Sequence, residues 1–144
     1  MLIYLIPFAL QGLAILFDEF YFHHKRRLPK WEVWGHPLDT TTVLICFLFL
    51  VYFPPSQTNI LVFAGLSFFS SLFVTKDEFV HSEKCEPAEN WLHAILFILH
   101  PIVFLSAGLI WYFNLDMQVI YGQIAILVAF LIYQIVYWGF YAKN

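Results

Sequence analysis

The hydrophobic positions of the chain fall into five long apolar stretches that short polar segments separate. Each stretch is about as long as the roughly 20 residues that an α-helix needs to cross a bilayer. None of them alternates apolar and polar residues as a strand would, and a closed barrel needs at least about eight strands. We therefore predict an all-α protein with five transmembrane helices, at residues 2–24, 31–53, 58–81, 88–113 and 117–141.

The composition also indicates an environment of lipid. Apolar residues make up 61% of the 144 residues, charged residues only 12%, and the mean hydropathy is +0.74. Soluble domains carry about 25% charged residues, so this chain has too few charges to cover a surface that faces water. The length suits one domain, and we expect residues 1–144 to form a single membrane domain. No basic run is long enough to indicate a nucleic-acid partner.

The basic residues predict the orientation. With five spans, all seven fall on one side of the membrane, and the loops on the other side hold none: Lys25, Arg26, Arg27, Lys30, Lys76, Lys84 and Lys143. The positive-inside rule makes their side the cytoplasm. We therefore expect an integral protein of the cytoplasmic (inner) membrane, with its N-terminus outside and its C-terminus inside.

One motif occurs twice, once in each of the two predicted cytoplasmic hairpins. Residues 18–36 contain Asp-Glu-Phe-Tyr-Phe-His, a proline six residues after that histidine, and then Glu-Val-Trp-Gly-His. Residues 77–93 contain Asp-Glu-Phe-Val-His, a proline at the same separation, and then Glu-Asn-Trp-Leu-His. We interpret this as an internal repeat of a two-helix unit, 2–53 and 58–113, related by a pseudo-two-fold axis along the membrane normal. Residues 117–141 add an extra packing helix.

The spacing within the motif predicts paired ligands. Each Glu-x-Trp-x-His segment separates its glutamate and histidine by four residues, which places both side chains on one helical face. The Asp-Glu-Phe segments separate them by four residues in the first copy and three in the second. Four helices then each bring one carboxylate and one imidazole to the same depth, at the cytoplasmic side. The predicted metal ligands are Glu19, His23, Glu32, His36, Glu78, His81, Glu89 and His93.

Neighbouring residues leave alternatives open. Asp18 and Asp77 could each orient a coordinating imidazole from outside the coordination sphere. Alternatively Asp77, four residues before His81, replaces Glu78 as a ligand. His24 points about 100° away from the preceding histidine on a helix, so it replaces that ligand, binds from the flank or faces the loop.

Two ionisable residues lie deeper in the predicted spans. Asp39 and His100 are candidate catalytic residues, because ionisable groups inside a membrane helix are functional hypotheses. We expect them to pair with each other, as a proton path or a substrate contact, or to be satisfied polar residues of the core. Gly65 and Gly108 are expected to allow close helix packing. Cys46 and Cys85 provide no disulfide framework and are expected to be unpaired thiols.

The ligand types indicate two metal ions. Eight ligands are too many for one zinc ion, which takes four, and carboxylates with imidazoles suit iron, manganese or zinc. The pattern resembles the inward Glu and Glu-x-x-His ligands of ferritin-like di-iron carboxylate four-helix bundles. Its many histidines resemble the sites of membrane fatty-acid hydroxylases and desaturases, although their His-x-x-His-His boxes are absent. These resemblances imply two iron ions in a four-helix bundle, and they identify no specific family.

The functional expectation is a di-iron oxidoreductase or hydroxylase. It would act on a lipid-soluble substrate at the cytoplasmic membrane face and take electrons from a donor protein on that side. One alternative is a zinc-dependent hydrolase that activates water. Another is a protein that binds metal for transport, sensing or structure without catalysis. A haem-binding electron carrier fits less well, because acidic residues accompany most of the histidines.

Overall fold

The computed structural model of the protein describes residues 2–142, apart from the side chains of Asp77, Phe79 and Val80. Within this part of the chain the regular structure is helical and contains no strand. The elements are α1 (Leu2–Phe17), η1 (Asp18–His23), α2 (His24–Arg26), α3 (Lys30–Tyr52), α4 (Gln57–Phe73), η2 (Val74–Asp77), α5 (Glu78–Lys84), α6 (Pro87–Tyr112), α7 (Met117–Tyr133) and η3 (Gln134–Tyr141).

These elements join into five continuous helices that are long and apolar enough to cross a membrane. They are Leu2–Arg26, Lys30–Tyr52, Gln57–Lys84, Pro87–Tyr112 and Met117–Tyr141. Each end lies within three residues of the end predicted from the hydrophobic pattern. The all-α class and the number of long apolar helices are thus confirmed.

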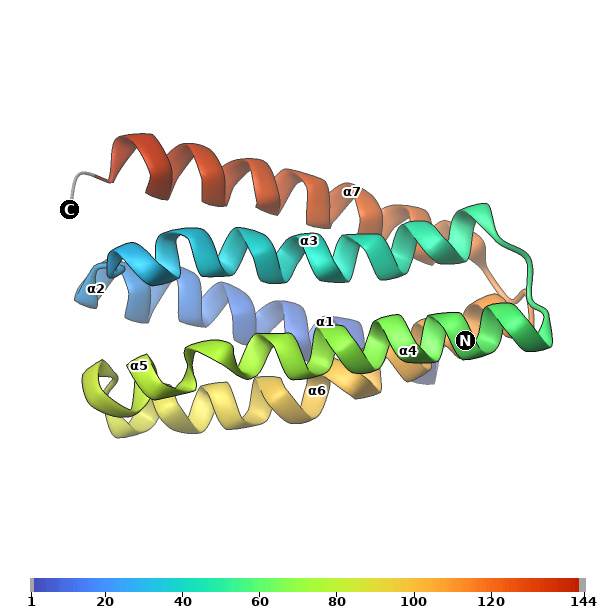
Figure 1. The fold of residues 1–144 in the computed structure, drawn as a ribbon, viewed down its shortest axis with the longest axis horizontal. Helices are drawn as coiled ribbons and strands as arrows, with labels where there is room; N and C mark the ends of the chain where they lie inside the picture. The colour runs from blue at the N-terminus through green and yellow to red at the C-terminus, as the bar shows by residue number, and fades with distance from the viewer. Residues whose placement is uncertain (1, 143–144) are drawn as a thin grey trace.

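The five helices run along one long axis (Figure 1). α1 packs against α6, α3 against both α4 and α7, and α4 against α6. The two spans of the first motif copy contact other helices more extensively than they contact each other. α2 and α5 lie together at one end of the bundle, where the fifth helix also ends (Figure 1).

Several helix ends follow from local sequence. The side chains of Ser56 and Asp116 cap α4 and α7, accepting hydrogen bonds from the backbone N–H groups of Asn59 and Gln118, both at 3.1 Å. Pro87 is the first residue of α6, where a missing N–H costs nothing.

The first motif copy contains a π-helix. Residues Asp18–His23 form η1, whereas the second copy continues through the short 3₁₀ and α-helical elements η2 and α5. A π-turn holds one residue more than an α-turn and is frequent at functional sites. It accommodates the extra residue of the first copy, and it brings Asp18 and His23, five positions apart, onto one face. The segment is therefore a π-helix rather than the α-helix expected from the sequence, although Glu19 and His23, four positions apart, contact each other as predicted.

The apolar core occupies the part of the bundle beyond the motif. Its most buried members come from three helices and include Phe47, Leu50, Ala107, Ile110 and Ile120. Large apolar side chains also cover the outer surface, among them Leu61, Ile98, Leu105 and Ile126, each more than 60% exposed. Soluble monomers rarely expose contiguous apolar surface on this scale.

The two glycines expected at helix contacts behave differently. A Cβ added to Gly108 would lie 3.0 Å from the Phe63 ring, which confirms close packing of α6 against α4 at this point. A Cβ at Gly65 would meet nothing within 4 Å, so the expectation for Gly65 is wrong.

Candidate metal centre

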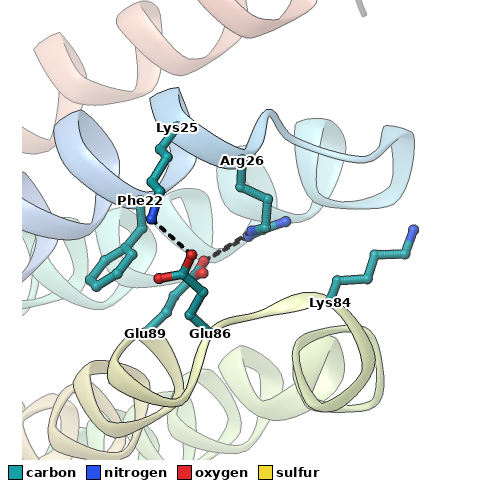
Figure 2. Close-up of a pocket in the computed structure, with 6 residues that line it drawn as sticks. All are labelled: Phe22, Lys25, Arg26, Lys84, Glu86 and Glu89. Carbon is teal, nitrogen blue, oxygen red and sulfur yellow. Dashed lines mark hydrogen bonds and ion pairs between the residues drawn. The ribbon is translucent and has the colours of Figure 1, made fainter.

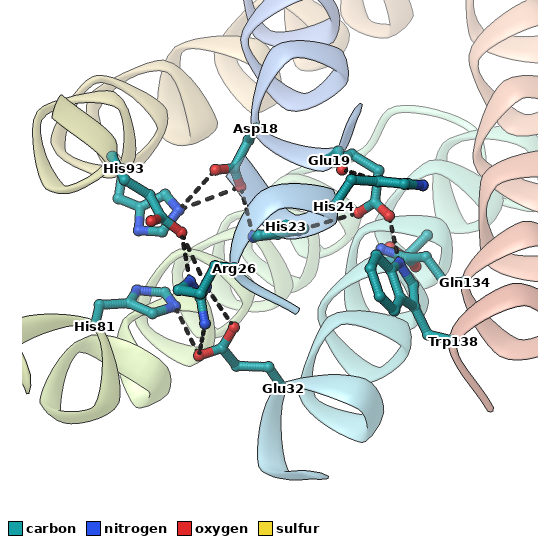
Figure 3. A network of polar contacts seen from close by, with 12 residues as sticks. Asp18, Glu19, His23, His24, Arg26, Glu32, His81, His93, Gln134 and Trp138 are labelled. Atoms are coloured by element: carbon teal, nitrogen blue, oxygen red, sulfur yellow. Dashed lines mark hydrogen bonds and ion pairs between the residues drawn. The ribbon is translucent and has the colours of Figure 1, made fainter. Parts of the chain in front are cut away.

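A cluster of buried ionisable side chains fills the end of the bundle that holds α2 and α5 (Figure 3). Glu32 is 0% exposed, Glu89 1% and Glu19 2%. Carboxylates are almost never buried this completely unless a cation or a metal compensates their charge. Both copies of the motif contribute to the cluster, whose most buried members are Asp18, Glu19, His23, Glu32, His81, Glu89 and His93.

One group of ligand atoms is centred on Asp18. Its Oδ2 lies 3.2 Å from Nε2 of His23, and its Oδ1 lies 3.1 Å from Nε2 of His93. Glu89 joins these three residues, and one ligand atom from each of the four lies within 4.8 Å of the others. Asp18, which the sequence placed outside the coordination sphere, therefore lies directly between two imidazoles.

A second group consists of Glu32, His36 and His81. Their ligand atoms also lie within 4.8 Å of one another, and Nε2 of His81 is 3.8 Å from Oε1 of Glu32. This group shares no residue with the group around Asp18. The cluster thus offers two sets of donors without a common residue, with four and three side chains, although other close groups in it take residues from both sets.

Glu19 lies at the edge of the cluster nearest the fifth helix. Its Oε2 is 3.3 Å from Nδ1 of His23, while its Oε1 accepts a hydrogen bond from Nε1 of Trp138. Glu19, His23 and His36 form a further group of close ligand atoms. The ring of His36 stacks on that of His23 at a centroid distance of 4.8 Å. Trp138 is buried in η3 and has no counterpart in the motif, so the spacing could not identify it.

Arg26 connects the two motif copies through their glutamates. Its Nη2 donates to Oε2 of Glu32 at 2.8 Å and to Oε1 of Glu89 at 2.9 Å. Nε also donates to Glu89 at 3.1 Å. From the sequence we interpreted the basic loop only as an orientation signal. The positive-inside rule explains an arginine at this position equally well, so the pattern held no sign of the contact.

A cavity opens beside Arg26 and Glu89 (Figure 2). It has a volume of about 210 Å³ and is lined by Phe22, Lys25, Arg26, Lys84, Glu86 and Glu89. At its rim, Nζ of Lys25 donates to Glu86 at 2.8 Å, and both of these side chains are more than half exposed. The cavity therefore leads from the exposed surface to one of the buried glutamates.

The charges of the cluster favour cation binding. Asp18, Glu19, Glu32 and Glu89 bring four carboxylates, and Arg26 compensates one of them. His23 has a carboxylate oxygen beside each ring nitrogen, an arrangement that suits either a doubly protonated imidazole or a metal on one nitrogen. Divalent cations are a common way to compensate such a set of buried carboxylates.

Two of the remaining ligand candidates, Glu78 and His24, do not join these groups. The side chain of Glu78 is exposed, and that of Asp77 lies outside the described residues. His24 is exposed; its Nδ1 lies 2.9 Å from the carbonyl oxygen of Glu19, and its ring stacks on Tyr137. The His24 side chain therefore faces the fifth helix rather than the buried carboxylates.

Asp39 and His100 do not form the expected pair. Both oxygens of Asp39 accept hydrogen bonds from Nζ of Lys76 at 2.7 Å, because a carboxylate with little access to water pairs best with a cation. The ring of His100 instead lies between Gln11, 3.0 Å from its Nδ1, and Ser70, 3.2 Å from its Nε2. The expectation that these two residues pair with each other is thus wrong.

Cys85 also lies beside the cluster. It forms no disulfide, as expected, and its sulfur is within 4.8 Å of ligand atoms of His81 and His93. Burial raises the pKa of its thiol, and the neighbouring Glu89 carboxylate raises it further. The spacing of four residues between His81 and Cys85 could have indicated that the thiol lies near this histidine.

No protein-family model, curated protein or solved structure matches the chain.

Proposed function

We propose that the protein is a membrane-embedded di-iron protein that oxidises or hydroxylates a lipid-soluble substrate. The observation that carries this proposal is the presence of two donor sets without a common residue in one buried cluster. One consists of Asp18, His23, Glu89 and His93, and the other of Glu32, His36 and His81. Carboxylates mixed with imidazoles in a helical bundle are the usual setting of paired iron ions.

The bilayer placement is supported by the five apolar helices and their apolar outer surface. In this placement the cluster lies at the cytoplasmic face, because the basic loop with Lys25 and Arg26 is at the same end. The N-terminus is then outside and the C-terminus inside. A substrate dissolved in the lipid would approach between the helices.

The repeat is part of the same proposal. Glu32 and Glu89 begin the Glu-x-Trp-x-His segments of the two copies, and both bind the guanidinium of Arg26. Equivalent residues that meet at one central cation are what a pseudo-two-fold axis through the cluster would produce. We therefore place the two ions on either side of Arg26.

The proposed reaction needs dioxygen and an external reductant. In a hydroxylation, one oxygen atom enters a C–H bond of the substrate and the other leaves as water, which consumes two electrons and two protons. The bound iron would supply the dioxygen chemistry. A donor protein on the cytoplasmic side would supply the electrons, and the exposed lysines beside the cavity, Lys25 and Lys84, offer it a charged docking surface.

Metal analysis of the purified full-length chain, produced with iron available, tests the proposal. We expect about two iron ions per chain, no Soret band and reductant-dependent dioxygen consumption that Glu32→Ala abolishes. Bound zinc without dioxygen consumption would favour a hydrolase or a structural role. If wild type and Glu32→Ala both contain no metal after purification, the metal site itself is overturned.

A further inference from the structure

The second motif copy contains a thiol that the first lacks. Cys85 follows His81 by four residues, and its backbone N–H donates to the carbonyl oxygen of His81 at 2.9 Å. This hydrogen bond continues the helical turn, so both side chains lie on one face. In the first copy the corresponding position, four residues after His23, is Arg27. The two halves of the cluster therefore differ chemically at this point.

The imidazoles beside Cys85 have nitrogen atoms without a hydrogen bond in the described part of the chain, although Nε2 of His81 lies 3.8 Å from Oε1 of Glu32. His81 is only 5% exposed, and neither of its ring nitrogens has a hydrogen-bond partner among the described residues. His93, also 5% exposed, uses Nε2 toward Asp18, while its Nδ1 has no such partner in the described part of the chain. Burying unsatisfied polar atoms costs about 1–3 kcal/mol per group. Such atoms in a native site require an explanation.

The positions of these atoms point to a common ligand. The His81 and His93 rings lie 4.2 Å apart between centroids without a hydrogen bond between them (Figure 3). The sulfur of Cys85 and one nitrogen from each ring all lie within 4.8 Å of one another. A single ion placed among the three would bind the sulfur and one nitrogen of each ring, including a nitrogen of His81 that has no hydrogen-bond partner in the described part of the chain.

We propose that Cys85 is a metal ligand, and that with His81 and His93 it forms a position of one thiolate and two imidazoles. This position shares His81 with the donor set of Glu32 and His36, and His93 with the donor set around Asp18. This inference rests on the proposed function in one respect, namely that the cluster binds metal. Thiolate and imidazole donors suit iron, zinc or cobalt, whereas magnesium and manganese prefer oxygen ligands. The position formed by Cys85, His81 and His93 therefore disfavours magnesium and manganese. The carboxylate-rich position around Asp18 does not disfavour them.

Metal binding at Cys85 exchanges a proton for a metal–sulfur bond. The thiol S–H bond breaks, the proton passes to solvent, and the sulfur electron pair forms the bond to the ion. No electron is gained or lost in this step, so it needs no oxidant or reductant.

Titration of the purified full-length protein with Co²⁺ alone, after removal of other metals, tests the inference. A cobalt–thiolate bond gives a charge-transfer band in the near ultraviolet. Cys46 is the matched control, because this thiol lies in the apolar core among Phe47 and Leu50. We expect the band in wild type and in Cys46→Ser, and its loss in Cys85→Ser and Cys85→Ala. The Cys85 variants should also bind one Co²⁺ at least about tenfold more weakly.

The outcomes separate the two proposals. Co²⁺ binding without the band in wild type, or a band that persists in both Cys85 variants, would overturn the role of Cys85 and leave the metal cluster intact. No Co²⁺ binding by any form would overturn this inference together with the proposed function. Circular dichroism of each variant shows whether the helices have formed.

Discussion

The guanidinium of Arg26 donates two hydrogen bonds to Oε1 of Glu89, from Nε at 3.1 Å and from Nη2 at 2.9 Å, although 63 residues separate the two. It also binds Glu32, so one cation holds a buried carboxylate from each motif copy. These contacts fasten α2 to the first turns of α3 and α6. Metal ions bound by these two glutamates, as proposed, would have to share them with Arg26 or displace it.

Arg26→Ala should destabilise the protein prepared without metal by about 3–5 kcal/mol, because Glu32 and Glu89 would remain buried without a compensating charge. Saturation with metal should restore part of this loss. Thermal unfolding in detergent, with and without iron, measures both effects. Lys25→Ala is the control, since the exposed Lys25–Glu86 pair should contribute little. An equal loss with and without metal would contradict a shared role of the glutamates.

Trp138→Phe should destabilise the protein by about 1–3 kcal/mol, because the buried Glu19 carboxylate loses a hydrogen-bond donor. Chemical unfolding followed by circular dichroism is the appropriate measurement. Trp91→Phe provides the comparison, since the Trp91 side chain is 73% exposed and should tolerate the change. Equal effects of the two substitutions would argue against a specific Trp138–Glu19 contact.

Gly108→Ala should lower stability, although alanine forms helices better than glycine. The new methyl group would lie 3.0 Å from Phe63, in a core where overpacking costs about 1–3 kcal/mol. Gly65→Ala has open space and should raise stability by up to about 1 kcal/mol. Melting temperatures of the two variants should therefore shift in opposite directions, and a parallel shift would show that the α4–α6 contact is misplaced.

His100→Ala should leave the metal content unchanged and reduce stability by about 1–3 kcal/mol. The reason is that His100 contacts Gln11 and Ser70 rather than the cluster, so its removal leaves polar groups of the bundle without a partner. Elemental analysis alongside thermal unfolding separates the two effects. Loss of metal in a variant that is still folded would place His100 in the metal centre after all.

The number and ends of the helices could be predicted because they depend on local properties. An apolar run of sufficient length forms a helix wherever lipid or other helices surround it. The Glu-x-Trp-x-His segments could also be predicted from their spacing, because they lie on regular α-helix. Their four glutamates and histidines all reach the cluster: Glu32, His36, Glu89 and His93. Their binding of metal remains a proposal.

The rest of the site depended on features that spacing does not encode. The π-helix of the first copy brings Asp18 between two imidazoles, and the side chain of Glu78 in the second copy is exposed. Arg26 contacts Glu89, which lies 63 positions further along the chain, and Trp138 contacts Glu19, which lies 119 positions earlier. Such contacts follow from how the helices pack, and neither residue belongs to the repeated pattern.

The most direct test of the account compares the metal content of two neighbouring variants. His23 is buried between Asp18 and Glu19, whereas the adjacent His24 is exposed and stacks on Tyr137. Elemental analysis of purified protein should find about two metal ions per chain in wild type and in His24→Ala, and at most about one in His23→Ala. Equal metal content in the two variants, or no metal in any of the three proteins, would contradict the central claim that this cluster is a metal centre.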